Sequence, residues 1–214
     1  NNLPFITGKI ACTKDYFINT SLKYISNQHS LGFSHILRYK NQGILITYKT
    51  ANLDNPKLNC RLNGLESFSP SRIIIDKNLK IKKNLYLVKT AKKIKTYIFY
   101  NKKNYKFDYL KNKGIKLIYC PIVNNRLDIF YLLKKIRKLK IDYLLVEGGK
   151  ILTFEFLRHK LFNNFYLIRS DQYSTIKKKN NIHDVLRLIK KNNFNKSNYI
   201  KTYVAGDKII EYIK

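Results

Sequence analysis

The amino-acid sequence predicts an α/β protein with a central mixed, mostly parallel sheet that is flanked by helices. Strand-like and helix-like segments alternate along the chain, which is the pattern of a sheet covered by helices. Strand candidates such as residues 43–50 and 141–149 are largely apolar without alternation, as strands buried on both faces are. Residues 199–214 predict an antiparallel C-terminal hairpin, because Gly206-Asp207 suits a tight turn between two strand-like runs.

The chain begins with a strand and a helix. Residues 3–13 contain an apolar, β-branched run that favours extended backbone. Residues 25–43 then predict a helix, with Ser26 or Asn27 as its N-cap and Gly43 just beyond it as a stop signal.

The rest of the chain continues the alternation after one long polar loop over residues 51–71. Loops of this length in compact domains are usually functional or disordered. Strands are expected at 72–76, 84–90, 96–101, 115–120, 141–149 and 163–170. Helices are expected at 104–114, where Gly114 is the stop signal, and at 126–140 and 150–162.

The composition indicates a folded protein in a reducing compartment. With 44% hydrophobic residues, the 214-residue chain can bury a substantial core. No apolar run approaches the roughly 20 residues of a membrane-spanning helix, and the start of the chain does not resemble a signal peptide. Cys12, Cys60 and Cys120 form neither a disulfide framework nor a metal-binding pair. We therefore expect a cytoplasmic protein with no metal site.

The net charge of +30 raises the possibility of a nucleic-acid partner, because lysine and arginine neutralise phosphates. A dedicated surface would cluster these residues and interleave exposed aromatic side chains. Here the 43 basic residues occur in nearly every segment, and the aromatic residues fall mostly in predicted strands. Compositional drift explains this distribution better, although the positive field would also favour a small anionic ligand.

The segment YLLVEGGKILTFEFL, residues 143–157, is the first candidate site. An apolar strand ends at Glu147, a glycine pair follows, and a helix begins. Ligands of α/β sheets bind at the carboxyl ends of strands, and a helix N-terminus offers free N–H groups to a phosphate. The alternative is a turn that only needs glycine at positive φ, with Glu147 paired to a lysine.

The second candidate is the loop TANLDNPKLNCR, residues 50–61, which follows a buried strand. Thr50, Asp54 and Arg61 lie together in this loop, although an aspartate before a proline is often turn chemistry alone. The chain contains no G-x-G-x-x-G fingerprint and no P-loop, and its histidines do not have metal-binding spacing.

The segments KIACTKD, LDNPKLNCR, RIIIDKN and VEGG, in this order, resemble the C-terminal reductase domain of the bifunctional riboflavin-biosynthesis deaminase/reductase. The resemblance covers nearly the whole chain. It implies a dihydrofolate-reductase-like fold and an NADPH-dependent enzyme. The implied reaction reduces 5-amino-6-(5-phosphoribosylamino)uracil to the phosphoribitylamino product by hydride transfer to the ribosyl C1′.

The resemblance also implies a set of site residues. Cofactor positions match Ala11, Tyr24, Thr50, Asp54, Gly148, Gly149, Lys150, Ile151, Leu152 and Thr153. Substrate positions match Arg38, Leu58, Arg61 and Glu147. Lys9 and Asp54 are the candidates for catalytic residues. Two arginines suit a phosphate, and Glu147 suits a donor-rich aminopyrimidine.

The chain departs from the family pattern at several positions. Tyr16 replaces a turn glycine, Tyr24 replaces a common tryptophan, and Asn55 replaces a common second aspartate. Asn163 and Asn164 occupy positions that are acidic in the family. These departures leave open an inactive homologue with a structural role.

We expect a single reductase domain over residues 1–214, without the H-x-E and P-C-x-x-C motifs of a zinc deaminase. Expected partners are the phosphorylated aminopyrimidine, a second copy in a homodimer, and a fused or separate deaminase. Two alternatives stay open. One is a related diaminopyrimidine or dihydrofolate reductase, and the other is a basic nucleic-acid-binding protein.

Overall fold

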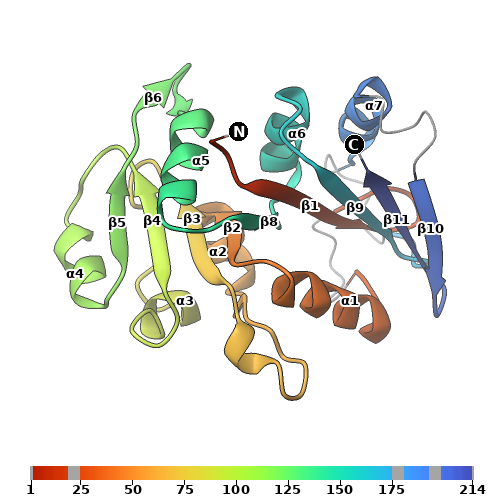
Figure 1. The fold of residues 1–214 in the computed structure, drawn as a ribbon, viewed down its shortest axis with the longest axis horizontal. Helices are drawn as coiled ribbons and strands as arrows, with labels where there is room; N and C mark the ends of the chain where they lie inside the picture. The colour runs from red at the N-terminus through yellow and green to blue at the C-terminus, as the bar shows by residue number, and fades with distance from the viewer. Residues whose placement is uncertain (1, 19–24, 175–180, 193–198, 214) are drawn as a thin grey trace. The chain divides into compact units, whose positions relative to one another are not determined.

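A computed structural model shows that the chain forms two compact units, whose ribbon is drawn in Figure 1. The described residues are 2–18, 25–174, 181–192 and 199–213. The first unit comprises Asn1–Phe5 and Arg38–Leu145, and the second comprises Ile6–Leu37 and Val146–Lys214.

Strands and helices alternate through most of the described chain, as the sequence predicts. The strands are β1 (Phe5–Cys12), β2 (Gly43–Thr47), β3 (Ser71–Ile75), β4 (Thr96–Tyr100), β5 (Lys116–Tyr119), β6 (Ile122–Val123), β7 (Arg126–Leu127), β8 (Tyr143–Val146), β9 (Asn164–Arg169), β10 (Tyr199–Val204) and β11 (Asp207–Ile213). The helices are α1 (Gln28–Tyr39), α2 (Tyr48–Asp54), α3 (Tyr86–Lys89), α4 (Phe107–Asn112), α5 (Ile129–Lys138), α6 (Lys150–Arg158) and α7 (His183–Lys191), with a 3-10 turn, η1 (Glu66–Phe68).

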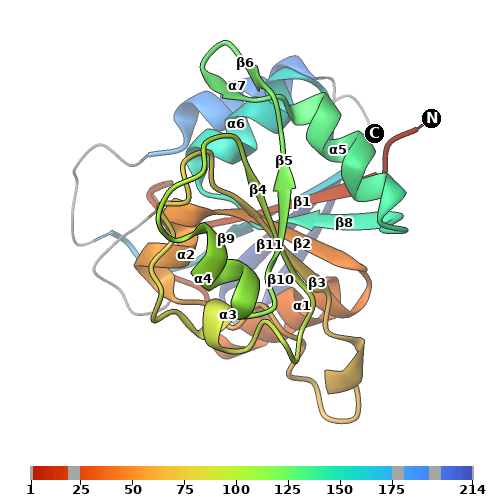
Figure 2. The ribbon, with the colours of Figure 1, turned by 90° about the vertical axis from the view of Figure 1, so that its left-hand side faces the viewer.

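The first unit contains strands in the order β8-β2-β3-β4-β5. Strands β2, β3, β4 and β5 pair in parallel. Because the three crossovers from β2 to β5 run in the same direction and crossovers are right-handed, α2, α3 and α4 lie on one face of the sheet. The return from β5 to β8 places α5 on the other face, as Figures 1 and 2 show.

The core of this unit comes from strands that are buried on both faces. Ile44, Leu45 and Ile46 of β2 are fully buried, as are Ile73 and Ile74 of β3. Successive side chains of a strand point to opposite faces, so consecutive burial requires cover on both sides. The prediction of doubly buried parallel strands is confirmed.

The second unit contains strands in the order β10-β11-β9-β1. Strand β9 pairs in parallel with β1 and antiparallel with β11, which pairs antiparallel with β10. Adjacent residues of β9 show the two faces: the ring of Phe165 contacts Phe162 and Tyr212, whereas the ring of Tyr166 contacts Phe33 of α1. The sheet is therefore mixed, with its antiparallel part at the C-terminus, as predicted.

Local capping explains where several helices begin and end. The Asn27 side-chain oxygen accepts from the Ser30 N–H at 2.9 Å, so Asn27 rather than Ser26 caps α1. Asp128 accepts from two N–H groups at the start of α5. Gly114 follows α4 with φ of +89°, a left-handed value that favours glycine after a helix.

Two expected strands are wrong in part. Residues 84–90 contain the short helix α3 instead of a strand, because the N–H groups of Val88 and Lys89 donate to the Leu85 carbonyl within the segment rather than to a neighbouring strand. The strand expected at 43–50 ends at Thr47, whose hydroxyl accepts from the Thr50 N–H and thereby starts α2.

The C-terminal turn lies one residue earlier than predicted. Val204 pairs with Asp207, so Ala205 and Gly206 form the turn, with φ of 48° and 95°. Asp207 is instead buried, and its carboxylate accepts from the Asn27 N–H at 2.9 Å. This contact ties the start of α1 to the start of β11.

Within the described residues, no helix has the length and apolarity needed to cross a bilayer. All three cysteines carry free, buried thiols. Burial raises the pKa of Cys12 to about 12, and burial also raises the pKa of Cys120 to about 12. Both thiols are therefore protonated near neutral pH.

Gly8 is required by packing. A Cβ at Gly8 would lie 2.5 Å from a ring carbon of Phe162 and 2.6 Å from one of Phe165. We expect Gly8→Ala to lower the free energy of unfolding by about 1–3 kcal/mol, the usual range for an overpacked core. Urea denaturation measures the change. The control is Gly32→Ala in helix α1, where a Cβ meets nothing within 4 Å, and which should gain about 0.5–1 kcal/mol. Equal stabilities of the two variants would contradict this account.

Candidate functional site

The predicted site residues are distributed over both units. The first unit carries Arg38, Thr50, Asp54, Leu58 and Arg61, and the second carries Lys9, Ala11, Glu147, Gly148, Gly149, Lys150, Ile151, Leu152 and Thr153. Tyr24 lies outside the described residues.

Helix α2 positions the first of these residues. The hydroxyls of Thr47 and Thr50 lie 3.2 Å apart at its N-terminus, directly after the carboxyl end of β2. Asp54 is the last residue of the helix, so the segment predicted as one long loop begins with an ordered turn of helix. The Asp54 side chain reaches solvent, yet the protein atoms around it displace enough water to raise its pKa.

The segment after α2 is shaped by two residues with left-handed backbone. Asn55 has φ of 42° and its N–H donates to the Ala51 carbonyl, which closes the helix. Leu58 has φ of 53° and is 2% exposed. Burial of Leu58 anchors the middle of the segment to the core, so its side chain is a packing group as much as a candidate contact.

Arg38 and Arg61 converge on one residue, Asn59. Arg38 Nη1 donates to the Asn59 main-chain carbonyl at 3.4 Å, and Arg61 Nη1 donates to the Asn59 side-chain oxygen at 3.0 Å. Helix α1 supplies the first arginine from its last turn, and the segment after α2 supplies the second. Two guanidinium groups are therefore bonded to the same residue, which is an arrangement that suits an anion.

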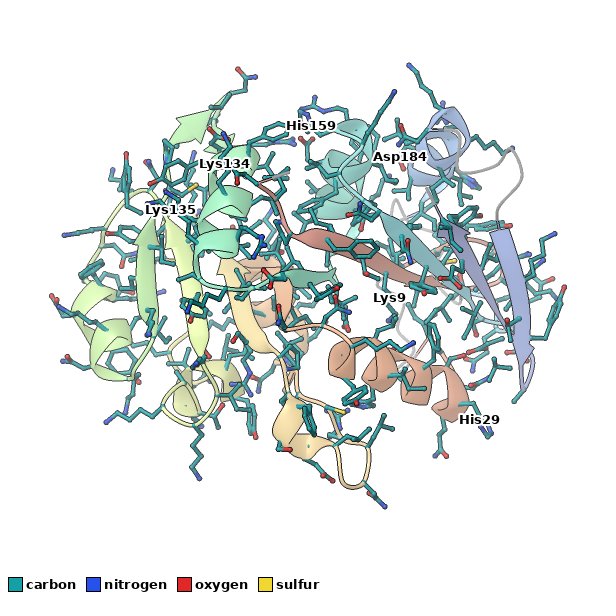
Figure 3. The ribbon with its side chains drawn as sticks, in the orientation of Figure 1. Lys9, His29, Lys134, Lys135, His159 and Asp184 are labelled. Carbon is teal, nitrogen blue, oxygen red and sulfur yellow. The ribbon has the colours of Figure 1, made fainter. Side chains whose placement is uncertain are left out.

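Lys9 and Ala11 lie on the same face of β1, because side chains alternate along a strand. Figure 3 shows Lys9 on the side of β1 toward α1. Lys9 is opposite Tyr166 of β9, and Tyr166 is opposite Glu211 of β11. The Tyr166 hydroxyl donates to Glu211 at 2.5 Å, and burial together with this bond raises the pKa of Tyr166.

The glycine pair after β8 has two different roles, and neither residue has positive φ. A Cβ at Gly148 would lie 2.6 Å from Leu152 Cδ2 and 2.7 Å from Leu152 Cβ. A Cβ at Gly149 would meet nothing within 4 Å. The explanation by a left-handed turn is therefore wrong: Gly148 allows close packing of α6, and Gly149 leaves open space at its N-terminus.

The first turn of α6 presents its backbone rather than its side chains. Gly149 is the N-cap, with φ of −68°, and has no side chain to bond the first N–H groups. Leu152 and Thr153 are buried, and Ile151 is exposed. Lys150 Nζ lies 3.1 Å from the Asp184 carboxylate, which ties the start of α6 to the start of α7. This is the geometry of a helix N-terminus that can receive an anion.

A family model described as the RibD C-terminal domain matches residues 4–169. The chain belongs to the RibD C-terminal domain family. A curated relative, the riboflavin biosynthesis protein RibD of Actinobacillus pleuropneumoniae, is 30% identical over 167 residues. The match covers 76% of this chain and 44% of the relative, so this chain spans less than half the length of that protein.

Solved structures share the fold. The riboflavin biosynthesis reductase Rib7 of Saccharomyces cerevisiae superposes with a TM-score of 0.75 at 18% identity, over 100% of this chain and 90% of that one. A deaminase/5-amino-6-(5-phosphoribosylamino)uracil reductase of Thermotoga maritima superposes with a TM-score of 0.71 at 18% identity, over 98% and 56%. The dihydrofolate reductase of Enterococcus faecalis gives 0.52 at 9% identity, over 98% and 95%, which confirms the dihydrofolate-reductase-like fold.

Tyr16 occupies a left-handed position, as a residue that replaces the turn glycine of the RibD C-terminal domain family should. Its φ is 64°, which is unusual for a bulky residue. The Arg169 guanidinium lies 4.6 Å from the Tyr16 ring, and the His183 ring lies 6.0 Å away. These contacts offset part of the backbone strain.

Another departure from the RibD C-terminal domain pattern, Asn163, has a structural role. Its side-chain oxygen accepts from the Ile6 N–H at 2.8 Å, and its own N–H donates to the Ile6 carbonyl. The asparagine thus joins the start of β9 to β1.

Three residues that bond to or pair with the candidate positions, directly or through one neighbour, carry no sequence motif: Asn59, Tyr166 and Glu211. Alternation places Lys9 on a face of β1, but the partner strand and its register depend on the tertiary fold. Asn59 carried no signal beyond its place between Leu58 and Arg61.

The two glycines of the VEGG motif in this RibD C-terminal domain should differ sharply in tolerance. We expect Gly148→Ser to lower the free energy of unfolding by about 1–3 kcal/mol, because the new side chain overlaps Leu152. Gly149→Ser should change it by less than about 0.5 kcal/mol, since serine is a good N-cap and the space is open. Thermal and urea unfolding compare the pair. A Gly149 variant that is the less stable of the two would overturn this assignment.

Proposed function

We propose that this chain is an NADPH-dependent reductase of riboflavin biosynthesis. It reduces 5-amino-6-(5-phosphoribosylamino)uracil to 5-amino-6-(5-phosphoribitylamino)uracil by hydride transfer to the ribosyl C1′. Membership of the RibD C-terminal domain family and the similarity in fold to the Thermotoga maritima deaminase/5-amino-6-(5-phosphoribosylamino)uracil reductase support this reaction. The observation that carries the proposal is the convergence of Arg38 and Arg61 on Asn59, because the substrate differs from many reducible pyrimidines by its phosphate.

Arg38 and Arg61 bind the substrate phosphate in this proposal. A guanidinium presents paired donors that match phosphate oxygens, and two of them neutralise its charge. The net charge of +30 raises the local concentration of an anionic substrate before it docks. Leu58 packs beneath this segment, and Glu147 accepts hydrogen bonds from the amino groups of the pyrimidine.

Residues at the N-terminus of α6 fit the phosphates of a dinucleotide cofactor. The open space at Gly149 and the uncapped first turn leave room for an anion and offer donors to it. Residues 148–153 would hold these phosphates through their main chain, and Ala11, Thr50 and Asp54 would contact the rest of the cofactor. When bound, NADPH supplies the hydride.

The protein's own contribution is to bind, orient and supply protons. Lys9 and Asp54 are the proposed catalytic residues. The raised pKa of Asp54 favours a carboxyl that keeps its proton to higher pH, as a proton donor requires. The opened sugar needs one proton on oxygen or nitrogen as the hydride arrives on carbon, and most of the barrier is lowered by positioning. The homodimer, the single domain over residues 1–214 and a deaminase partner stay predictions.

Cofactor binding is the first test. NADPH fluorescence should saturate with the purified chain at about 0.15 M salt, where non-specific attraction is screened. Gly149→Asp should weaken the apparent Kd by about 10-fold or more, because a carboxylate then faces the phosphates. Gly149→Ala is the control, because it adds a side chain without a charge. A parallel titration with NADH measures the preference for the 2′-phosphate of NADPH. Equal Kd values for the Asp and Ala variants would argue against phosphates at this helix.

The phosphate assignment needs a substrate test. Arg38→Gln and Arg61→Gln should each lower kcat/KM for the phosphorylated substrate by about 10- to 100-fold, the value of a hydrogen bond to a charged group. Both should leave the dephosphorylated analogue nearly unchanged. Arg126→Gln on the small β6-β7 hairpin is the control. An equal loss of kcat/KM on the phosphorylated and dephosphorylated substrates would show that the arginines do not bind the phosphate.

A nucleic-acid-binding function is the second candidate, and one surface favours it. Tyr105, which lies outside the strands, is 80% exposed. Lys83 Nζ lies 5.3 Å from the Tyr105 ring and 4.7 Å from the Tyr109 ring, and Lys113 Nζ lies 5.5 Å from the Tyr109 ring. Lysines beside exposed rings are typical of single-strand binders.

This candidate predicts that Tyr105→Ala weakens binding of a single-stranded oligonucleotide by about 10-fold at 0.15 M salt, through lost base stacking of about 1–3 kcal/mol. Fluorescence anisotropy at several salt concentrations measures the effect. Binding that ignores the tyrosine and disappears with salt would reflect diffuse charge alone.

A further inference from the structure

Arg72 is a buried charge in the first unit that the proposed reaction does not use. It is fully buried at the start of β3, and burial lowers its pKa to about 10, so it stays charged near neutral pH. Its Nη1 donates to the Thr90 hydroxyl at 2.7 Å, and its guanidinium lies 5.5 Å from the Tyr86 ring. Its Nε and Nη2 have no hydrogen-bond partner among the described residues. Such a charge is costly to bury, so its position calls for an explanation.

The contacts of Arg72 lead to the segment that carries Arg61. Thr90, which accepts from Arg72, donates its hydroxyl to the Tyr86 carbonyl at 2.7 Å. The Tyr86 N–H donates to the Asn55 side-chain oxygen at 2.8 Å. Lys57 Nζ also lies 5.6 Å from the Tyr86 ring. Helix α3 is therefore held to β3 by Arg72 and to the segment after α2 by Asn55 and Lys57.

A second set of contacts reaches α2 from the other end of the RIIID motif. Asp76 is fully buried and accepts from the N–H groups of Lys80 and Ile81, each at 2.8 Å. The turn that Asp76 orders is bonded to Asn52 of α2, which donates to the Lys80 carbonyl at 3.1 Å and accepts from the Lys82 N–H at 2.9 Å. The last residue of the RIIID motif therefore supports α2, and the first supports the segment that follows α2.

We propose that Arg72 and Asn55 are positioning residues, which act through Thr90 and Tyr86 to hold the segment from Asp54 to Arg61 in its reactive arrangement. This inference rests on the proposed function for the role of that segment. Asn55 connects α2 to α3. Its left-handed backbone ends α2 directly after Asp54, and its side-chain oxygen accepts a hydrogen bond from α3. Loss of the side-chain acceptor would leave the Tyr86 N–H unbonded and free the segment to move.

The same geometry explains why Asn55 can stand where the family commonly has aspartate. Asparagine and aspartate both tolerate left-handed backbone, and both have an oxygen that accepts from an N–H. The departure at Asn55 therefore keeps both the left-handed backbone and the side-chain acceptor that connect α2 to α3. It is not a sign of a decayed site.

The test compares three residues at position 55 in the full chain. Asn55→Asp keeps the acceptor and the backbone preference, whereas Asn55→Gly keeps the backbone freedom and removes the acceptor. We expect the Gly variant to raise KM for the phosphorylated substrate by about 10-fold, since small displacements of binding groups are costly, and the Asp variant to stay within about two-fold of the parent. Assays well below the unfolding temperature of each variant separate positioning from stability. Unchanged KM and kcat in the Gly variant would overturn the proposal.

A second measurement does not depend on the reductase activity. Hydrogen exchange of the Tyr86 amide and of residues 54–61 should quicken by about five-fold in Asn55→Gly and in Thr90→Val, the effect of losing one ordinary hydrogen bond. Arg72→Met should do the same if it folds, and Arg137→Met on the exposed side of α5 is the control. If the parent chain lacks reductase activity, the proposed function fails and the exchange result still decides whether Arg72 and Asn55 hold this segment. Exchange that is unchanged in both Asn55→Gly and Thr90→Val would overturn the inference.

Discussion

The burial of β2, β3 and β4 on both faces is the constraint on which the first unit depends. Apolar strands of this kind must be covered by helices on each side, so the chain leaves every strand through a crossover. The chain therefore turns directly after the last residue of each strand. Thr47 ends β2 and caps α2, and Asp76 follows β3 and accepts hydrogen bonds from the turn after it. Residues available for binding are gathered at these ends because the strands themselves are fully occupied by packing.

Space rather than backbone freedom decides the important glycines. Gly8 admits the rings of Phe162 and Phe165, and Gly148 admits Leu152. In contrast, the left-handed positions at Tyr16 and Asn55 are filled by residues with side chains, whose contacts compensate for the strained backbone. A glycine in a family motif can therefore mark either a position where another side chain packs against the backbone or a turn with positive φ. Only the atoms that surround the glycine in the structure distinguish the two cases.

Most of the basic residues are spread over the surface, but a few cations have specific hydrogen-bond or ion-pair partners. Arg38 and Arg61 share Asn59 as a hydrogen-bond partner, and Lys150 is paired with Asp184. Arg72 is the opposite case, because it is removed from water and supported by one hydroxyl and one ring. The surface lysines create a diffuse positive potential that attracts any anion. The few positioned groups instead make interactions of fixed orientation, which net charge alone does not provide.

The sequence by itself determined the alternation of strands and helices, the double burial of the parallel strands, the C-terminal hairpin and the motifs of the family. Each of these is a property of one segment, visible in its periodicity, its caps or its residue order. Tertiary structure alone decided that α3 forms within residues 84–90, that Asn59 bonds to two arginines, and that Arg72 is connected to Asn55 through α3. These contacts join residues far apart in the chain, and their partners follow from the crossovers and the strand register, which no local pattern encodes.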